Sequence, residues 1–282
     1  IDAYKNNKFQ CLFNTENQLY IVDRNGNDIE GFPLHLPMST SLGHALFDYN
    51  NTRKYRIIIV GNDNNIYNLD KKGKKVKGWK YTKTQDRIIS TPTHFKVSNK
   101  DYIIAHTNSS TTKLLAVNGS ERVKFDGKTH FSNLNLEVDH HGTLYAITDA
   151  GKLWRGTTNG IATEMTVSNL NNTSLFICNN INIEGDQEFI YTNDKTVYIT
   201  DNNFELLSSF STKGSIKSLA TYHGKLLVLT NNELYLWNNN TITEGFPIST
   251  DGHFNIADIN NNTKSNIINS NNGFIFNYEI DN

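Results

Sequence analysis

Short apolar segments separated by Asn, Asp and Gly recur along the whole sequence. Their alternation of apolar and polar positions is typical of half-buried antiparallel strands, and the residues between them favour turns. No window keeps an apolar spacing of three and four residues over the ten or so positions that a helix needs, so we expect almost no helix. The clearest set of four consecutive strands is predicted at residues 44–48, 55–60, 65–70 and 76–80.

One unit is repeated through the sequence. Residues 18–33 recur as residues 65–79, with Tyr20 matching Tyr67. The repeat centres lie about forty residues apart on average, which is the length of one four-stranded propeller blade. The sequence therefore predicts an all-β fold, with residues 1–282 forming a single β-propeller domain of about seven four-stranded blades. The remaining centres are Leu115, Trp154, Tyr198, Tyr235 and Ile275.

The first and last predicted blades lie at the two ends of the chain. The last one lacks an outer strand, so its edge is either open or covered by a segment from elsewhere, because proteins usually cover an unpaired edge. Since the sequence starts at Ile1 rather than Met, we expect a processed chain or a fragment of a longer protein. The strands are expected at 1–4, 9–14, 19–23 and 30–34, and at 254–259, 265–269 and 274–280.

Charge and cysteine content narrow the classes of partner. The formal net charge is -1, from 27 Lys and Arg against 28 Asp and Glu, so there is no excess positive charge for a nucleic-acid backbone or an anionic membrane. No apolar run reaches the roughly 18 residues of a spanning helix, so we expect no membrane insertion. Cys11 and Cys178 suggest neither a disulfide framework nor a paired-cysteine metal site, although one bridge between them is geometrically possible.

One segment, residues 144–154, resembles the repeat of quinoprotein-like (PQQ-repeat-like) β-propellers through Leu-Tyr-Ala-Ile-Thr-Asp-Ala-Gly-Lys-Leu-Trp. The Gly-Phe-Pro and Gly-Trp endings of the repeats point the same way. The chain is also similar to the carboxy-terminal propeller of uncharacterised Bacteroidetes envelope proteins, through residues 47–51 and 55–58. This resemblance implies a propeller, an exported location in the periplasm or at the outer membrane, and a role in protein assemblies. It does not imply quinone binding, because the charged and disulfide-linked residues of the quinone enzymes are not found.

Two turns carry oxygen-rich side chains with a spacing like that of calcium loops. One holds Asp48 and Asn50, the other holds Asp258 and Asn260, and residues 180–186 are a similar case of equal strength. Alternating side-chain oxygens can wrap Ca²⁺, but Asn in place of Asp lowers the charge that holds the ion. We therefore favour structural turns and keep calcium as the alternative. No other cofactor is expected.

Four histidines fall near the start of predicted innermost strands. In a propeller, such positions can converge on one mouth of the central channel and permit metal or anion binding. An ordinary polar channel lining is the competing interpretation, and we favour it. These candidates are His44, His94, His130 and His253, whereas His140 and His141 are predicted at an exposed hairpin tip.

The sequence contains no nucleophile elbow, no zinc-binding pair of histidines on a helix and no phosphate-cradling Gly loop. Carboxylates from distant strands can still meet in space, as glycosidase acids do. Phe32, Trp79 and Phe246 each follow a Gly at matched blade positions, which favours packing between blades over sugar stacking. We predict a non-enzymatic protein-interaction or scaffold propeller, whose partner is another protein or the remainder of its own chain. The alternative is a carbohydrate-binding or glycan-active propeller with its site at the channel mouth.

Overall fold

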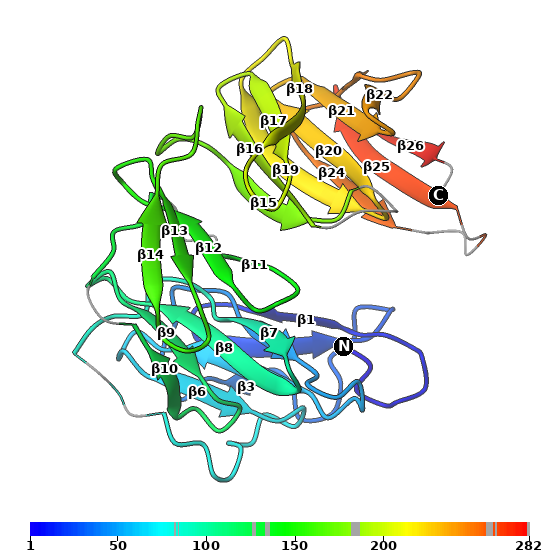
Figure 1. Cartoon of the computed structure of the whole chain (residues 1–282). Coiled ribbons are helices and arrows are strands. Elements are labelled where there is room, and N and C mark those ends of the chain that lie inside the picture. The colour runs from blue at the N-terminus through cyan, green and yellow to red at the C-terminus, as the bar shows by residue number, and fades with distance from the viewer. Residues whose placement is uncertain are drawn as a thin grey trace. The chain divides into compact units, whose positions relative to one another are not determined.

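The strands of the chain form a succession of antiparallel sheets. The computed structural model describes residues 1–81, 83, 85–125, 128–132, 136–181, 187–257, 262 and 264–280. This part of the chain holds seven sheets and has no helical residue, so the predicted all-β fold is confirmed (Figure 1). No helix capable of crossing a membrane therefore occurs among these residues.

The first compact unit comprises Ile1–His130 together with Gly156–Ala162. It holds three sheets of three, three and four strands. The first contains β1 (Cys11–Asn14), β2 (Gln18–Val22) and β3 (Leu34–His35); the second β4 (Ala45–Phe47), β5 (Arg56–Val60) and β6 (Ile66–Leu69); the third β7 (Thr93–Val97), β8 (Lys100–His106), β9 (Thr112–Leu115) and β10 (Glu121–Lys124).

The second compact unit comprises Phe131–Arg155 and Thr163–Asn282. It holds the last three sheets and most of the fourth. These are β11 (Glu137–Val138), β12 (Leu144–Ile147), β13 (Leu153–Gly156) and β14 (Ala162–Met165); β15 (Phe176–Asn179), β16 (Glu188–Asn193), β17 (Thr196–Thr200) and β18 (Leu206–Ser211); β19 (Ile216–Tyr222), β20 (Lys225–Thr230), β21 (Glu233–Asn238), β22 (Thr241–Ile242) and β23 (Ile248–Ser249); and β24 (Phe254–Ala257), β25 (Ser265–Asn271) and β26 (Phe274–Ile280).

Every predicted repeat centre lies at the same position of its blade. In all sheets after the first, this position is the third strand counted from the innermost one. In the first sheet it is β2, and before β1 the backbone of Ile1 exchanges two hydrogen bonds with that of Gln10. The predicted strand at residues 1–4 is therefore wrong. The chain turns after Ile1 because the Asp2 carboxylate accepts hydrogen bonds from backbone N–H groups further along the turn.

The outer strands are shorter than predicted. The expected strand at residues 76–80 is reduced to a bridge between Leu69 and Lys75 and one bond from the Val76 N–H to the Asn68 carbonyl. In the sixth sheet, the outer strand is split into β22 and β23, which both pair with β21. The three predicted strands of the last blade are confirmed as β24, β25 and β26, and no described strand pairs with the outer edge of β26.

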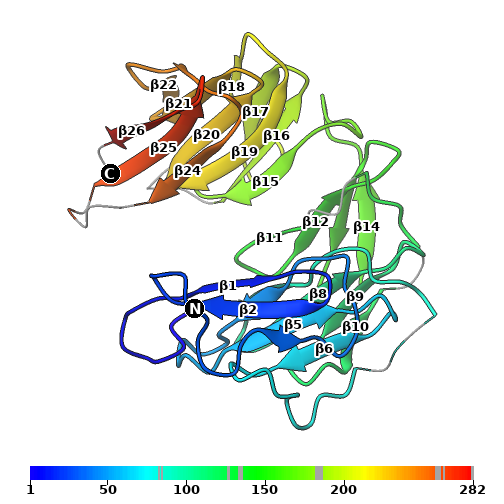
Figure 2. The ribbon, with the colours of Figure 1, turned by 180° about the vertical axis from the view of Figure 1, so that it is seen from behind.

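Within each unit, neighbouring sheets pack face to face through their second strands. Figure 2 labels β2, β5 and β8, which belong to the first, second and third sheets. On β5, Ile57 and Ile59 contact a cluster that includes Leu19 of the first sheet, whereas Ile58 and Val60 belong to the cluster shared with the third sheet. Successive residues of a strand point to opposite faces, so a strand that is covered on both sides reads as a continuous apolar run. Full burial of such a side chain contributes about 1.5–3 kcal/mol. This packing is the blade stacking that the sequence predicted.

The same arrangement recurs in the second unit. On β20, Leu226 and Val228 pack against the fifth sheet, and Leu227 and Leu229 pack against the seventh. The aromatic residues that follow a Gly are part of this packing. Phe32, Trp79 and Phe246 each contact a cluster shared by two sheets, so their predicted role in packing between blades is confirmed.

Candidate functional site

The predicted calcium turn at Asp48 is closed by the protein's own backbone. Its carboxylate accepts hydrogen bonds from the N–H groups of Thr52 at 3.1 Å and Arg53 at 2.7 Å, and Asn50 is exposed beside it. These bonds give the carboxylate a structural partner in the absence of any cation. The other calcium candidates, Asp258, Asn260 and the interior of 180–186, lie outside the described residues.

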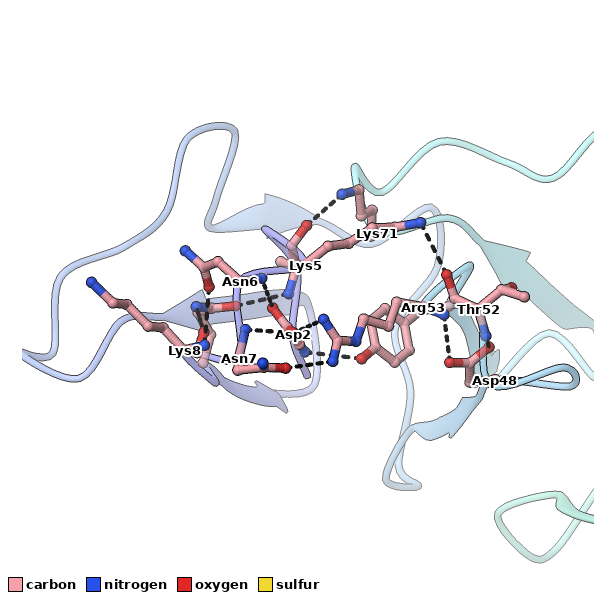
Figure 3. Close-up of polar contacts among 12 residues, drawn as sticks. Asp2, Lys5, Asn6, Asn7, Lys8, Asp48, Thr52, Arg53 and Lys71 are labelled. Carbon is pink, nitrogen blue, oxygen red and sulfur yellow. Dashed lines mark hydrogen bonds and ion pairs between the residues drawn. The ribbon is translucent and has the colours of Figure 1, made fainter.

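The same turn is repeated at Asp2, whose covered carboxylate joins the first two blades (Figure 3). It accepts bonds from the backbone N–H groups of Asn6 at 3.1 Å and Asn7 at 3.0 Å, and Arg53 forms an ion pair with it at 2.8 Å. Burial raises the pKa of Asp2, but these backbone hydrogen bonds and the charge of Arg53 outweigh burial and lower the pKa overall. The Lys71 ammonium donates to the Ala3 carbonyl beside it.

Three of the four histidine candidates lie in the first unit, and each has a separate partner. The Nδ1 atom of His44 lies 2.9 Å from Oδ1 of Asn14, and Nε2 of His94 lies 3.0 Å from Oδ1 of Asp101. The third, His130, has its Nδ1 2.7 Å from the Ser110 hydroxyl.

The fourth candidate, His253, lies in the second unit, where its carbonyl accepts a hydrogen bond from the Ser270 N–H. Over the described part of the chain, no group of three or more His, Cys, Asp or Glu side chains is close enough to hold a metal ion. The role of the four histidines at a channel mouth stays a prediction.

The second unit contains a cleft of about 460 Å³ that the sequence did not predict. Two hairpin turns border it, one between β11 and β12 and the other between β17 and β18. Its volume falls in the range of small-molecule sites. The lining residues are Asp139, His140, His141, Tyr145, Arg155, Met165, Gln187, Phe189, Asn202, Asn203 and Phe204.

Aromatic rings form one side of this cleft. The buried ring of Phe189 meets the Tyr145 ring edge-to-face at 4.9 Å and stacks on the Phe204 ring at 4.6 Å between centroids. Burial, followed by the nearby Asp139 charge, raises the pKa of Tyr145 to about 12. The phenol therefore stays neutral at physiological pH and donates to Oδ2 of Asp139 at 3.2 Å.

Among the described lining residues, the polar side of the cleft has one guanidinium, Arg155, and one carboxylate, Asp139. The carboxylate is already engaged: its Oδ1 accepts the N–H groups of His141 and Thr143, and its Oδ2 accepts the Tyr145 hydroxyl. Arg155 is exposed and has no ion-pair or hydrogen-bond partner among the described residues. An anionic group entering the cleft would therefore meet an unneutralised guanidinium.

The predicted exposed hairpin tip at His140 and His141 is confirmed. The tip also lines the cleft, where Nδ1 of His140 lies 2.8 Å from Oε1 of Gln187.

One signal in the sequence could have indicated the cleft. The turn at residues 201–205 has Phe204 where the matching turns at 23–27 and 70–74 have Gly.

A smaller cavity of about 200 Å³ lies along the innermost strands of the second unit. It is lined in part by Glu137 of β11, Ile177 of β15 and Lys217 of β19, and β15 contacts both other strands. Burial raises the pKa of Glu137, although a hydrogen bond from the Cys178 N–H partly offsets this. Burial and the Glu137 charge also raise the pKa of the Cys178 thiol, which makes it a poor nucleophile. Both cysteines are free.

Comparison with solved structures identifies the fold. The chain is similar to the Dos1 propeller, with a TM-score of 0.59 and 13% identity over 96% of this chain and 76% of that one. It is also similar to BamB from Moraxella catarrhalis, with a TM-score of 0.54 and 15% identity over 98% and 83% of the two chains. The chain is a β-propeller. Its seven sheets agree with the predicted blade count.

A third similar structure is PorZ of the type-IX secretion system of Porphyromonas gingivalis, with a TM-score of 0.53 and 16% identity. The match covers 96% of this chain and 37% of PorZ. No protein-family model matches the sequence, and no curated protein matches it. At these identities the likeness establishes the propeller fold, and a shared fold does not imply a shared function.

Proposed function

We propose that the chain is a non-enzymatic protein-interaction or scaffold propeller of a bacterial cell-envelope protein, with residues 1–282 as one domain. Sheets that are covered on both faces form a rigid frame, which suits a surface that docks another protein. The partner is a second protein or the remainder of the chain's own polypeptide.

The observation that carries this proposal is the apolar surface of β26. This strand lies at the edge of its sheet, and its first three residues are exposed although all are large and apolar. An apolar strand with a free edge favours association with another polypeptide, so proteins usually cover it. The exposed fractions are 69% for Phe274, 79% for Ile275 and 39% for Phe276.

The location rests on the resemblance to Bacteroidetes envelope proteins. It is supported by the similarity to PorZ, which is described as an essential bacterial surface component of a secretion system. We therefore propose a periplasmic or outer-membrane-associated protein. Fractionation of cells that express the full gene tests the location, and recovery of the protein with the cytoplasm would contradict it.

Site-specific photo-crosslinking tests the interaction. A benzoyl-phenylalanine introduced in place of Ile275 is expected to yield a discrete cross-linked product in the native organism. The matched control places the same group at Ile161, which is 63% exposed on a hairpin of the first unit. A product formed equally at both positions, or at neither, would contradict the proposal.

A further inference from the structure

One type of five-residue turn is repeated in both units. In each copy the first residue's N–H bonds to the carbonyl of the fifth, and the fourth residue's N–H bonds back to the carbonyl of the first. The fourth residue has a positive φ, a conformation that suits Gly and is tolerated by Asn. Among the described residues, this fourth position holds Gly26, Asn64, Gly73, Ser110, Gly119, Gly142, Gly151, Gly160 and Phe204.

The turn at residues 201–205 differs from the others, whose fourth residue is the small Gly, Asn or Ser. Its backbone bonds match those of the others, with Asp201 N–H to Glu205 carbonyl at 3.0 Å and Phe204 N–H to Asp201 carbonyl at 3.1 Å. Its fourth residue is nevertheless Phe204, with a φ of 64°. A bulky aromatic residue in the left-handed region is strained, and such outliers concentrate at sites that bind ligands.

The strained conformation places an aromatic ring at the cleft of the second unit. The Phe204 ring stacks on Phe189 and lines the cleft together with Met165. A Gly at this position would satisfy the turn but would leave the cleft without this apolar wall. Met adapts its shape to different apolar side chains, which suits a surface that receives a flexible partner.

The charged groups of the cleft favour an anionic ligand. Arg155 has no counter-ion among the described residues, His140 and His141 lie on the same rim, and the Asp139 carboxylate is engaged by its own turn and by Tyr145. A guanidinium binds a carboxylate through two parallel hydrogen bonds. The amides of Asn202 and Asn203 supply donors and acceptors of the kind that pair with a peptide backbone.

We propose that this cleft binds a short acidic peptide segment of the protein partner. A bulky apolar side chain of the segment packs against Phe204 and Met165, and a neighbouring carboxylate pairs with Arg155. This inference rests on the proposed protein-interaction function and assigns it a second, separate surface. A peptide is favoured over an acidic saccharide because the cleft combines an adaptable apolar wall with amide groups.

Peptide selection on the purified chain tests the proposal. A library of random nine-residue peptides displayed on phage is the probe, and the consensus peptide is then synthesised for fluorescence anisotropy. We expect Asp or Glu next to a bulky apolar residue in the consensus. Arg155→Gln is expected to weaken binding about tenfold or more, as the loss of a charge-assisted bond does, and added salt should weaken binding to the wild type.

Two further variants make the test specific. Phe204→Gly keeps the turn, because the matching turns already have Gly there, and it is also expected to weaken binding about tenfold. Arg24→Gln is the control, since Arg24 is exposed in the matching turn of the first unit and should leave binding unchanged.

Several outcomes would overturn the proposal. They are a consensus without acidic residues, equal binding by wild type and Arg155→Gln, or binding of acidic saccharides on an array with no peptide enriched. A cross-link at Ile275 that persists alongside any of these results would leave the proposed function standing. Acidic peptides selected without that cross-link would support the cleft and reject the β26 edge.

Discussion

The guanidinium of Arg53 lies 2.8 Å from the covered carboxylate of Asp2, which fixes the first turn of the chain to the second blade. The carboxylate also accepts two backbone hydrogen bonds, from the N–H groups of Asn6 and Asn7. Three donors therefore converge on one anion. The cluster lies at the start of the first blade, ahead of β1.

We expect Asp2→Asn to lower the melting temperature, because an amide supplies one oxygen where the carboxylate supplies two and leaves Arg53 without its counter-ion. Differential scanning calorimetry at neutral pH measures the change. Arg53→Gln should have the smaller effect, since Arg53 is partly exposed and the two backbone hydrogen bonds remain. Equal melting temperatures for wild type and Asp2→Asn would contradict this role.

The same cluster predicts sensitivity to strong acid. The pKa of Asp2 is lowered from its ordinary 3.8 in the folded chain, so the unfolded state binds more protons as the pH falls below that value. The stabilisation is therefore complete above pH 3.8 and is lost as the pH falls through the folded-state pKa. Urea unfolding between pH 5 and pH 2 should show a steeper loss for wild type than for Asp2→Asn.

A buried histidine predicts a second loss of stability in weaker acid. Burial lowers the pKa of His106 from 6.5 to about 4, so the unfolded state takes up the proton first as the pH falls. The free energy of unfolding should decrease from pH 6.5 downward, by about 3 kcal/mol at pH 4. His106→Asn should remove this contribution from unfolding curves measured at pH 7.5 and 5.0. The exposed His35→Asn is the control, and an unchanged pH profile in His106→Asn would reject the assignment.

Because each sheet is covered on both faces, adjacent residues of one strand should contribute equally to the free energy of unfolding. Ile57 and Ile58 are both fully buried, on opposite faces of β5. Each Ile→Ala substitution should cost about 2–5 kcal/mol in the free energy of unfolding. In a sheet with one solvated face, only one of them would do so. Leu207→Ala, at an exposed site on β18, should stay within about 0.5 kcal/mol of wild type.

Substitutions of Trp79 in the second repeat should lower the free energy of unfolding by different amounts. Trp79 packs on the cluster between the second and third sheets, and its Nε1–H donates to the Ile66 carbonyl at 2.7 Å. Trp79→Ala should cost about 3 kcal/mol, and Trp79→Phe, which keeps most of the packing, about 1 kcal/mol. Equal losses in the two variants would show that the hydrogen bond, and not the packing, dominates.

The turn at Asp48 predicts no response to calcium. Its carboxylate already accepts the backbone N–H groups of Thr52 and Arg53. The melting temperature should therefore be the same in millimolar calcium as in EDTA. A rise of several degrees on adding calcium that Asp48→Asn abolishes would instead support the calcium interpretation of this turn, since a bound ion stabilises the folded state.

Repetition in the sequence was sufficient to predict the strands and their order. Tyr20, Tyr67 and Tyr235 mark the same strand of three blades because side-chain alternation and turn chemistry are local properties of the chain. The run Ile57–Val60 was predicted as a half-buried strand, and the structure shows that both of its faces are covered. Short outer strands were harder to predict. A single bridge at Lys75 replaces the strand expected at residues 76–80, because the chain turns at Gly78, within that range.

Only the tertiary structure decided which turns stand beside each other. His140 and Gln187 are far apart in sequence, and their contact depends on how the fourth and fifth sheets pack. The cleft that contains Phe204 and Arg155 arises from the same packing. Local sequence determines the shape of each turn because its hydrogen bonds span only five residues. Long-range packing determines the site, because the site belongs to no single repeat.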